Sequence, residues 1–203
     1  GSIRLGEQAV TGGGVPASMR AAMQIVFQDP YGSFNPRHRV ERLVAEPFHL
    51  IADAPQGAAR KYAVVAALEA VRMTASDADK YIHEFSGGQR QRIAIARALV
   101  IRPKLIILDE AVSALDVSIR AQILDLLAEL RDSHGLAYLF ISHDLGVVTS
   151  ITDRVMVMKD GEIVEHGPTA DVMGAPAHGY TRELVAARPQ IPPEWSQDRK
   201  AGR

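Results

Sequence analysis

A continuous apolar run that ends in two acids reads Leu105-Ile106-Ile107-Leu108-Asp109-Glu110. Four apolar residues in a row, without polar alternation, indicate a strand that is buried on both faces of a parallel sheet. In open α/β sheets, ligands bind at the edge formed by the carboxyl ends of the strands. The run therefore predicts a sheet that delivers Asp109 and Glu110 to a binding edge. Acids also follow strands merely to solvate the strand end, and the pair alone does not separate the two interpretations.

The segments around this run alternate between strand and helix patterns. Upstream, Met23 to Phe27 is a short apolar run of strand type, and residues 40–101 are mostly helical in pattern. Downstream, Asp116 precedes a helix with apolar residues at helical spacing, and Ala137 to Ser142 is a second buried strand. This alternation predicts an α/β core with a parallel sheet, interrupted by a helical subdomain.

The last third of the chain shows shorter elements. A short helix is predicted from Asp144 to about Thr152, followed by a hairpin that turns at Asp160-Gly161. Two short helical stretches follow Gly167-Pro168, and a polar tail begins at Pro189.

The composition of the 203 residues narrows the class of protein. With 47% hydrophobic residues and a formal net charge of -1, the chain is typical of a soluble globular protein and gives no electrostatic reason to expect nucleic acid as a partner. The absence of cysteine excludes disulfides and thiolate metal sites. No apolar run reaches the ~20 residues that a membrane span requires. Because the chain starts at Gly1 rather than Met, we expect a trimmed or truncated chain.

A second string, Ser86-Gly87-Gly88-Gln89, stands where a helix begins. Serine is a good N-cap, and glycines at a helix start let backbone N–H groups approach an anion where the helix dipole is positive. The alternative is a serine-capped helix with a glycine turn, which accounts for most such strings on their own. The arginines that follow, at 90, 92 and 97, are interpreted as a solvated helix face rather than a nucleic-acid patch.

Five motifs, taken together, resemble those of ABC transporter ATPases, and the resemblance spans residues 1–188. In chain order they are similar to the Q-loop (Phe27 to Pro30), the signature motif (Phe85 to Arg92), the Walker B strand (Leu105 to Glu110), the D-loop (Ser113 to Asp116) and the switch-histidine motif (Ile141 to Asp144). Phe85 stands where leucine is more usual. The finer resemblance is to dipeptide and oligopeptide importers, through residues 27–37, 109–118 and 161–184, although nickel, glutathione and sugar importers share it. Ala111 stands where many members have proline.

The resemblance implies roles for the site residues, with ATP and Mg2+ as cofactors. Glu110, His143 and Gln28 would be catalytic, Asp109 and Gln28 would hold Mg2+, and a neutral His143 would hydrogen-bond the terminal phosphate. Ser86, Gly87, Gly88 and Gln89 would bind the nucleotide of a second subunit. The D-loop residues Ser113, Ala114, Leu115 and Asp116 would couple the two sites.

One motif of the family does not occur. A P-loop reads G-x-x-x-x-G-K-[ST], and the 203 residues contain no Gly-Lys pair. Gly12-Gly13-Gly14 is followed by Val15-Pro16 and cannot replace it. We therefore expect the P-loop to lie before residue 1, the chain alone to bind ATP weakly if at all, and the strands at 105–108 and 137–142 to have unpaired edges.

The predicted fold class is an incomplete RecA-like P-loop NTPase core of α/β type, with a parallel sheet and an inserted α-helical subdomain. The predicted division is a remnant of the N-terminal core at 1–35, the helical subdomain at 36–101, the catalytic core at 102–166 and a C-terminal extension at 167–203.

The predicted function is the ATP-hydrolysing subunit of an importer, for di- or oligopeptides, bound peripherally at the cytoplasmic face of the inner membrane. The expected partners are a second ABC ATPase subunit, identical or related, membrane permease subunits and, indirectly, an extracytoplasmic solute-binding protein. One alternative is a non-catalytic interaction module. Another is an ABC ATPase that acts in DNA repair or on the ribosome. Such proteins usually carry a long coiled-coil insertion or a tandem second cassette, and neither is visible in this sequence. The transported solute is not encoded in this chain.

Overall fold

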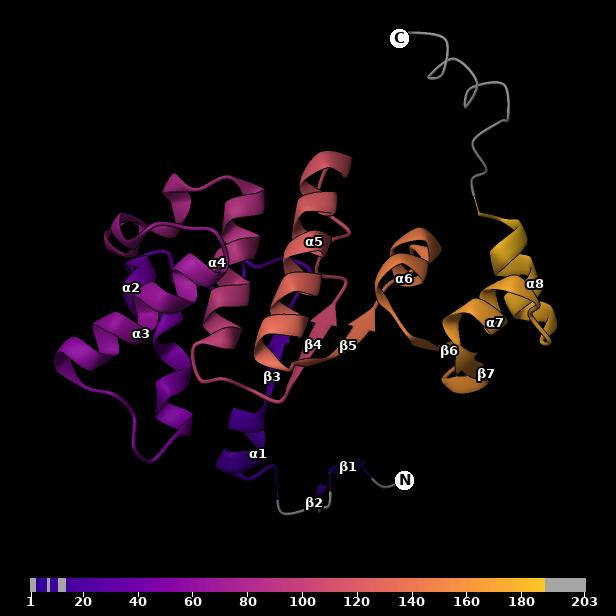
Figure 1. Cartoon of the computed structure of the whole chain (residues 1–203), viewed down its shortest axis with the longest axis horizontal. Coiled ribbons are helices and arrows are strands. Elements are labelled where there is room, and N and C mark those ends of the chain that lie inside the picture. Colours follow the sequence, from indigo (N-terminus) through magenta and orange to yellow (C-terminus); the bar gives the residue numbers. More distant parts are fainter. Residues whose placement is uncertain (1–2, 7, 11–13, 189–203) are drawn as a thin grey trace, which may run out of the picture. The chain divides into compact units, whose positions relative to one another are not determined.

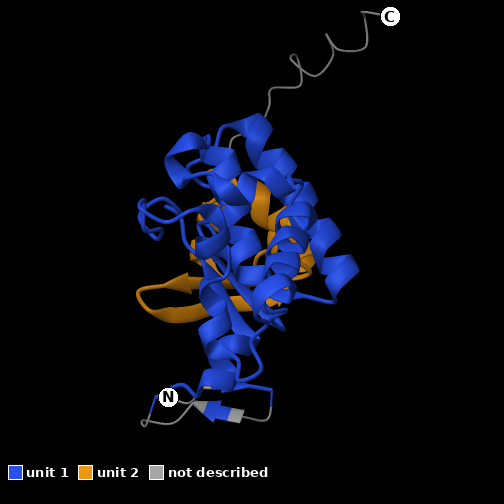
Figure 2. Cartoon of the chain, turned by 90° about the vertical axis from the view of Figure 1, so that its left-hand side faces the viewer, with its two compact units in different colours: residues 1–142 blue, residues 143–203 orange. Residues whose placement is uncertain are grey.

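The computed structural model describes residues 3–6, 8–10 and 14–188. The chain divides into two compact units, residues 1–142 and residues 143–203 (Figure 2). Each unit is described by itself. The glycines at 12 and 13 and the predicted polar tail from Pro189 lie outside the described residues.

A three-stranded parallel sheet forms the centre of the first unit (Figure 1). Its strands lie in the order β3 (Met23–Val26), β4 (Leu105–Asp109) and β5 (Ala137–Ile141), each continuous with a predicted strand. Val26 pairs with Leu108, which pairs with Phe140 on its other side. The carboxyl ends of all three strands therefore meet at one edge.

The sequence predicted unpaired edges for two strands, and the structure shows one of them. The prediction that residues 105–108 would have an unpaired edge is wrong, because β3 pairs along one side of β4 while β5 pairs along the other. The expectation for residues 137–142 is met among the described residues, where β5 pairs with β4 alone. β4 is thus the central strand of the described sheet.

The two faces of the sheet are unequally covered. On one face Ile106 and Leu108 are fully buried beneath α5 (Val117–His134), and the Tyr138 hydroxyl donates to the Leu127 carbonyl of that helix at 2.9 Å. Burial raises the pKa of this phenol. On the other face Leu139 is 38% exposed and Ile141 is 45% exposed. The first face supplies the apolar burial that stabilises the sheet.

A helical subdomain separates β3 from β4 in the sequence. It contains α2 (Val40–Val44), α3 (Gly57–Ala70), α4 (Gly87–Leu99) and the 3-10 turns η1 (Glu46–Leu50), η2 (Ala75–Asp79) and η3 (Ile82–Glu84). Pro47 opens η1 and interrupts the helical pattern there. Buried Leu43, Leu68 and Ile93 contribute one core position from each of the three α-helices. Before β3 the chain forms an antiparallel pair, β1 (Ile3–Leu5) with β2 (Gln8–Val10), and α1 (Ala17–Ala22).

The arginines of α4 are not a solvated face, so that interpretation is wrong. Arg97 donates to the Ser33 carbonyl at 3.0 Å and lies over the Phe34 ring, and only 12% of its side chain is exposed. Arg90 donates to the Ile82 carbonyl at 3.1 Å, and Arg92 donates to the Val71 carbonyl and to the Gln122 amide oxygen. These arginines tie α4 to the segments packed around it, because a guanidinium carries several donors on a rigid fork.

The second unit is built on a hairpin. Its strands β6 (Arg154–Lys159) and β7 (Glu162–Pro168) join through Asp160-Gly161, whose φ angles of 52° and 83° fit the predicted tight turn. Around it lie α6 (Leu145–Ile151), α7 (Thr169–Gly174) and α8 (Gly179–Ala186). None of the helices within the described ranges combines the length and the apolar character that a membrane crossing needs.

Candidate nucleotide site

The acids and the glutamine predicted for catalysis follow neighbouring strands. Asp109 is the last residue of β4 and pairs with Ile141 of β5, and Glu110 comes directly after it. Gln28 lies two residues beyond the end of β3 and is exposed, whereas the two acids are half-buried. Since β3 and β4 are parallel, the structure brings Gln28, Asp109 and Glu110 to the same edge of the sheet.

Glu110 has an unusual backbone. Its φ is +48°, in the left-handed region that residues with a Cβ rarely adopt. Its N–H donates to the Ile141 carbonyl at 3.0 Å, and its carbonyl accepts from the Ser113 amide at 3.0 Å and from the Ser113 hydroxyl at 2.9 Å. These bonds hold a conformation that costs about 1–3 kcal/mol, and such conformations cluster at functional sites.

The segment predicted to be the D-loop, Ser113 to Asp116, is held by the first turn of α5. The Asp116 carboxylate caps the helix by accepting from the Ile119 amide at 2.9 Å, as the sequence predicts for the start of this helix. Arg120 donates to the Leu115 carbonyl at 3.2 Å and to the Ser113 carbonyl at 3.5 Å. The role of Arg120 was not predicted, since nothing in its local sequence marks it.

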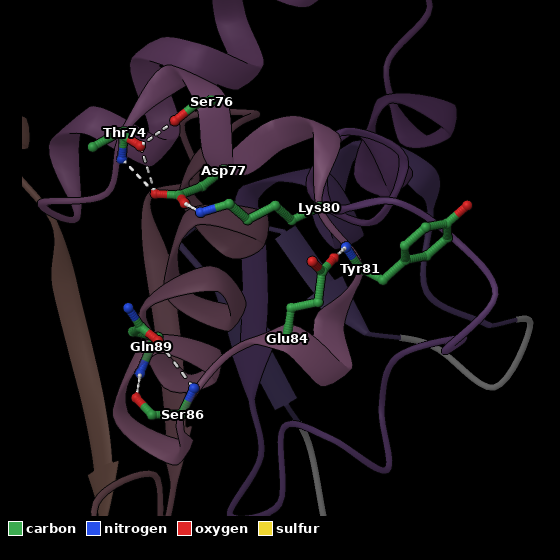
Figure 3. A network of polar contacts seen from close by, with 8 residues as sticks. All are labelled: Thr74, Ser76, Asp77, Lys80, Tyr81, Glu84, Ser86 and Gln89. Carbon is green, nitrogen blue, oxygen red and sulfur yellow. Dashed lines mark hydrogen bonds and ion pairs between the residues drawn. The ribbon is translucent and has the colours of Figure 1, made fainter.

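The predicted signature motif begins α4 with a turn, Ser86 to Gln89, which we call the signature turn. A reciprocal pair of hydrogen bonds closes it (Figure 3). The Ser86 amide donates to the Gln89 side-chain oxygen at 3.0 Å, and the Gln89 amide donates to the Ser86 hydroxyl at 3.4 Å. The Ser86 oxygen acts here as an acceptor, so its proton stays available to donate to an anion at the positive end of the helix. The Ser-x-x-Gln spacing is the sequence signal for this capping box.

The two glycines of the signature turn differ in their surroundings. A Cβ added at Gly87 would meet nothing within 4 Å, whereas one added at Gly88 would lie 2.5 Å from Cγ2 of Ile119. Gly87 therefore leaves the space that a phosphate needs for close approach. Gly88 has a packing reason as well, because α4 and α5 touch at this point.

Removing the cap at Ser86 should destabilise the first unit. We expect Ser86→Ala to lower the free energy of unfolding by about 1 kcal/mol, because the Gln89 amide loses its acceptor. The measurement is urea unfolding followed by circular dichroism. Ser118→Ala, at an exposed position in the first turn of α5, is the matched control and should change stability by less than about 0.5 kcal/mol. Equal losses in both variants would show that the Ser86 cap is not the cause.

Two turns before the signature turn are closed by a carboxylate that accepts from the backbone amide three residues earlier, Asp77 from Thr74 and Glu84 from Tyr81 (Figure 3). Asp77 accepts from the Thr74 amide and hydroxyl at 2.9 and 2.8 Å and from Lys80 at 2.7 Å. Burial raises the pKa of the Asp77 carboxyl. The hydrogen bonds from Lys80 and Thr74 together lower it by more than burial raises it, so the pKa lies below its usual value.

A lowered pKa makes the contribution of Asp77 depend on pH. The carboxylate stabilises the fold above its unfolded-state pKa, and this stabilisation is lost as the pH falls through the lower folded-state value. We expect Asp77→Asn to lower stability by about 1 kcal/mol at pH 7. The difference should shrink as the pH falls below the ordinary aspartate pKa of about 3.9 and through the lower folded-state pKa. Thermal unfolding across this range measures it, and the exposed neighbour variant Asp79→Asn should show a smaller difference. A pH-independent difference for Asp77→Asn would contradict the assignment.

His143 is the first residue of the second unit and is exposed. The next residue, Asp144, caps α6 by accepting from the Gly146 amide at 2.9 Å and from the Val147 amide at 3.2 Å. The acids belong to the first unit, and the role of His143 beside them stays a prediction.

The predicted metal ligands fit a Mg2+ ion that is bound partly by the protein and partly by the phosphates of a nucleotide. Within the described ranges no three His, Cys, Asp or Glu side chains gather as a metal cage. Mg2+ usually keeps several waters and binds one or two carboxylates together with substrate phosphates. A half-buried Asp109 carboxylate with the exposed Gln28 amide at the same edge fits that donor set.

A three-stranded parallel sheet with two acids at its carboxyl edge and α-helices packed against it gives the chain an α/β fold, as expected for part of a P-loop NTPase core. The chain belongs to the ABC transporter family, whose sequence model matches residues 1–113. It is 46% identical to the dipeptide transport ATP-binding protein DppF of Haemophilus influenzae over 90% of this chain and 56% of that protein. It is 52% identical to the glutathione import ATP-binding protein GsiA of Escherichia coli K12 over 87% of this chain and 28% of that protein.

The fold comparison agrees with the family assignment. A dimeric post-hydrolysis state of the ATP-binding cassette MJ0796, bound to ADP and phosphate, is 28% identical with a TM-score of 0.65, covering 75% of this chain and 65% of that one. This likeness confirms the predicted fold class. The chain spans about half the length of DppF and less than a third of GsiA.

Proposed function

We propose that this chain is part of the ATP-hydrolysing subunit of an importer for peptides or small peptide-like solutes, acting at the cytoplasmic face of the inner membrane. The names of DppF and GsiA, which refer to dipeptide transport and glutathione import, support the solute class. The observation that carries the proposal is Glu110, held in a left-handed conformation next to Asp109 at the carboxyl edge of β4.

The reaction would be in-line attack of water on the terminal phosphate of ATP, releasing ADP and phosphate. Glu110 would accept a hydrogen bond from the attacking water and polarise it. Asp109 and Gln28 would hold Mg2+, which neutralises the charge on the phosphates when bound. His143 would donate a hydrogen bond to the terminal phosphate if its imidazole reaches the edge.

The signature turn would act on the nucleotide of a second ATPase subunit. The dimeric state of the MJ0796 cassette supports a paired arrangement. In such a pair the Ser86 hydroxyl and the Gly87 amide would contact the phosphates held by the other subunit, where the exposed turn leaves room. Permease subunits would bind the segment after Gln28 and the helical subdomain, and a solute-binding protein would act through them.

The proposal is tested by joining this chain to an N-terminal segment that carries a G-x-x-x-x-G-K-[ST] sequence, and by assaying the joined protein beside the chain alone. We expect magnesium-dependent phosphate release from the joined protein only. No release, at any protein concentration that permits pairing, would overturn the proposed activity.

A second candidate function is a non-catalytic interaction module. It is favoured by the lack of a G-x-x-x-x-G-K-[ST] sequence in these 203 residues. Calorimetry of the chain alone with ATP distinguishes the two, since a micromolar dissociation constant would argue against the module.

A further inference from the structure

One residue, Ile119 in the first turn of α5, touches both loops to which the proposed function gives roles across a subunit pair. Its side chain lies against the backbone of Gly88 in the signature turn, so closely that a Cβ on Gly88 would be 2.5 Å from Cγ2 of Ile119. Its backbone amide donates to the Asp116 carboxylate of the D-loop at 2.9 Å. Ile119 is therefore a direct link between the signature turn and the D-loop of one chain.

Neighbouring contacts make this link part of a seam. Arg120, the next residue, donates to the Leu115 carbonyl at 3.2 Å and so holds the D-loop backbone to the same turn of α5. One turn further along both helices, Arg92 of α4 donates to the Gln122 side-chain oxygen of α5 at 3.3 Å. The contact at Gly88 is thus supported on both sides.

We propose that Ile119 is a positioning residue that makes the signature turn and the D-loop move as one body. The roles of the two loops rest on the proposed function, whereas the contact does not. Glycine at position 88 leaves no flexible side chain between the α4 backbone and Ile119. A β-branched isoleucine in a helix has one strongly preferred rotamer, so a displacement of one loop passes to the other with little slack.

Amide hydrogen exchange on the 203-residue chain tests the link. Gly88→Ala introduces a methyl group that overlaps Ile119 Cγ2, and Ile119 must move. We expect exchange at the Ser113 and Leu115 amides, which donate to the Glu110 and Val112 carbonyls, to become about tenfold faster. Adding Ile119→Ala to the same chain leaves the Cβ atoms of residues 88 and 119 about 3.7 Å apart, an ordinary van der Waals contact. This contact replaces the lost one and should return both rates to within about threefold of the original.

Two conservative variants serve as controls. Gly87→Ala adds the same methyl group where nothing lies within 4 Å, and it should leave the D-loop rates unchanged. Ile119→Val keeps Cγ2, the atom nearest Gly88, and should also leave them within about threefold, whereas Ile119→Ala alone should raise them about tenfold. Exchange in α3 reports whether each variant is folded.

Three results would overturn the proposal: unchanged D-loop exchange in Gly88→Ala, an increase that Ile119→Ala fails to reverse, or equal effects of Ile119→Val and Ile119→Ala. If Gly88→Ala does not fold, the comparison of the two Ile119 variants decides the question. The exchange measurement needs neither ATP nor hydrolysis. If the proposed ATPase activity is absent, the exchange rates still decide whether Ile119 links the two loops.

Discussion

Leu108→Ala should lower the free energy of unfolding by about 2–5 kcal/mol. Leu108 is fully buried in β4, the central strand of the sheet, and it lies on the face covered by α5. Removing most of its side chain loses the transfer free energy of the buried atoms and leaves a cavity. The surrounding residues cannot fill this cavity, because β4 is hydrogen-bonded to a strand on each side. Urea unfolding followed by circular dichroism measures the loss.

The matched control is the same substitution on the neighbouring strand. Leu139 of β5 is 38% exposed on the opposite face of the sheet. Leu139→Ala should therefore cost less than about 1.5 kcal/mol, because more than a third of the residue is already in contact with water and its truncation leaves no enclosed cavity. If both variants lose the same stability, the two faces of the sheet are not unequally packed as described.

Glu110→Gln should reduce ATP hydrolysis by a factor of about 10²–10⁴ in the protein joined to a P-loop segment. The amide keeps the size of the side chain and the hydrogen bonds that hold the backbone of residue 110, but it no longer offers a carboxylate to polarise the attacking water. ATP affinity should stay within about threefold, because the proposed role belongs to the chemical step. Phosphate release and equilibrium ATP binding are the two measurements.

Asp125→Asn supplies the control for the lost charge. Asp125 is exposed on α5 and carries the same formal charge as Glu110, so its variant should hydrolyse ATP within about twofold of the original. A Glu110→Gln protein that retains full hydrolysis would remove Glu110 from the mechanism. A matching loss in Asp125→Asn would assign the effect to net charge instead.

The local elements of this fold are predictable from sequence because their signals are short-range. Four apolar residues before Asp109 mark β4, Asp116 marks the start of α5, and Gly135 marks its end through a φ of 63°. The turn at Asp160-Gly161 follows from the same kind of local chemistry. Likewise, the parallel order of the strands places Gln28 near the acids once the pairing is known.

The long-range relations were not predictable in the same way. Met23 pairs with Leu105, although the whole helical subdomain lies between them in the sequence. No local sequence pattern predicts that β3 pairs along one side of β4. Arg97 looks like any charged helix residue until Ser33 and Phe34 pack over it. The reason for glycine at position 88 is also not readable from sequence, because glycine allows close approach both of a ligand and of a neighbouring side chain.

The left-handed backbone at position 110 has a consequence for anyone who engineers this protein. Glycine fits that geometry without steric conflict, so heat-challenge screening of random libraries should enrich substitutions there as apparent improvements. If Glu110 has the proposed catalytic role, such variants would be more stable and would lose ATP hydrolysis. A thermostabilisation campaign should therefore keep this codon fixed and score survivors by turnover rather than by melting temperature.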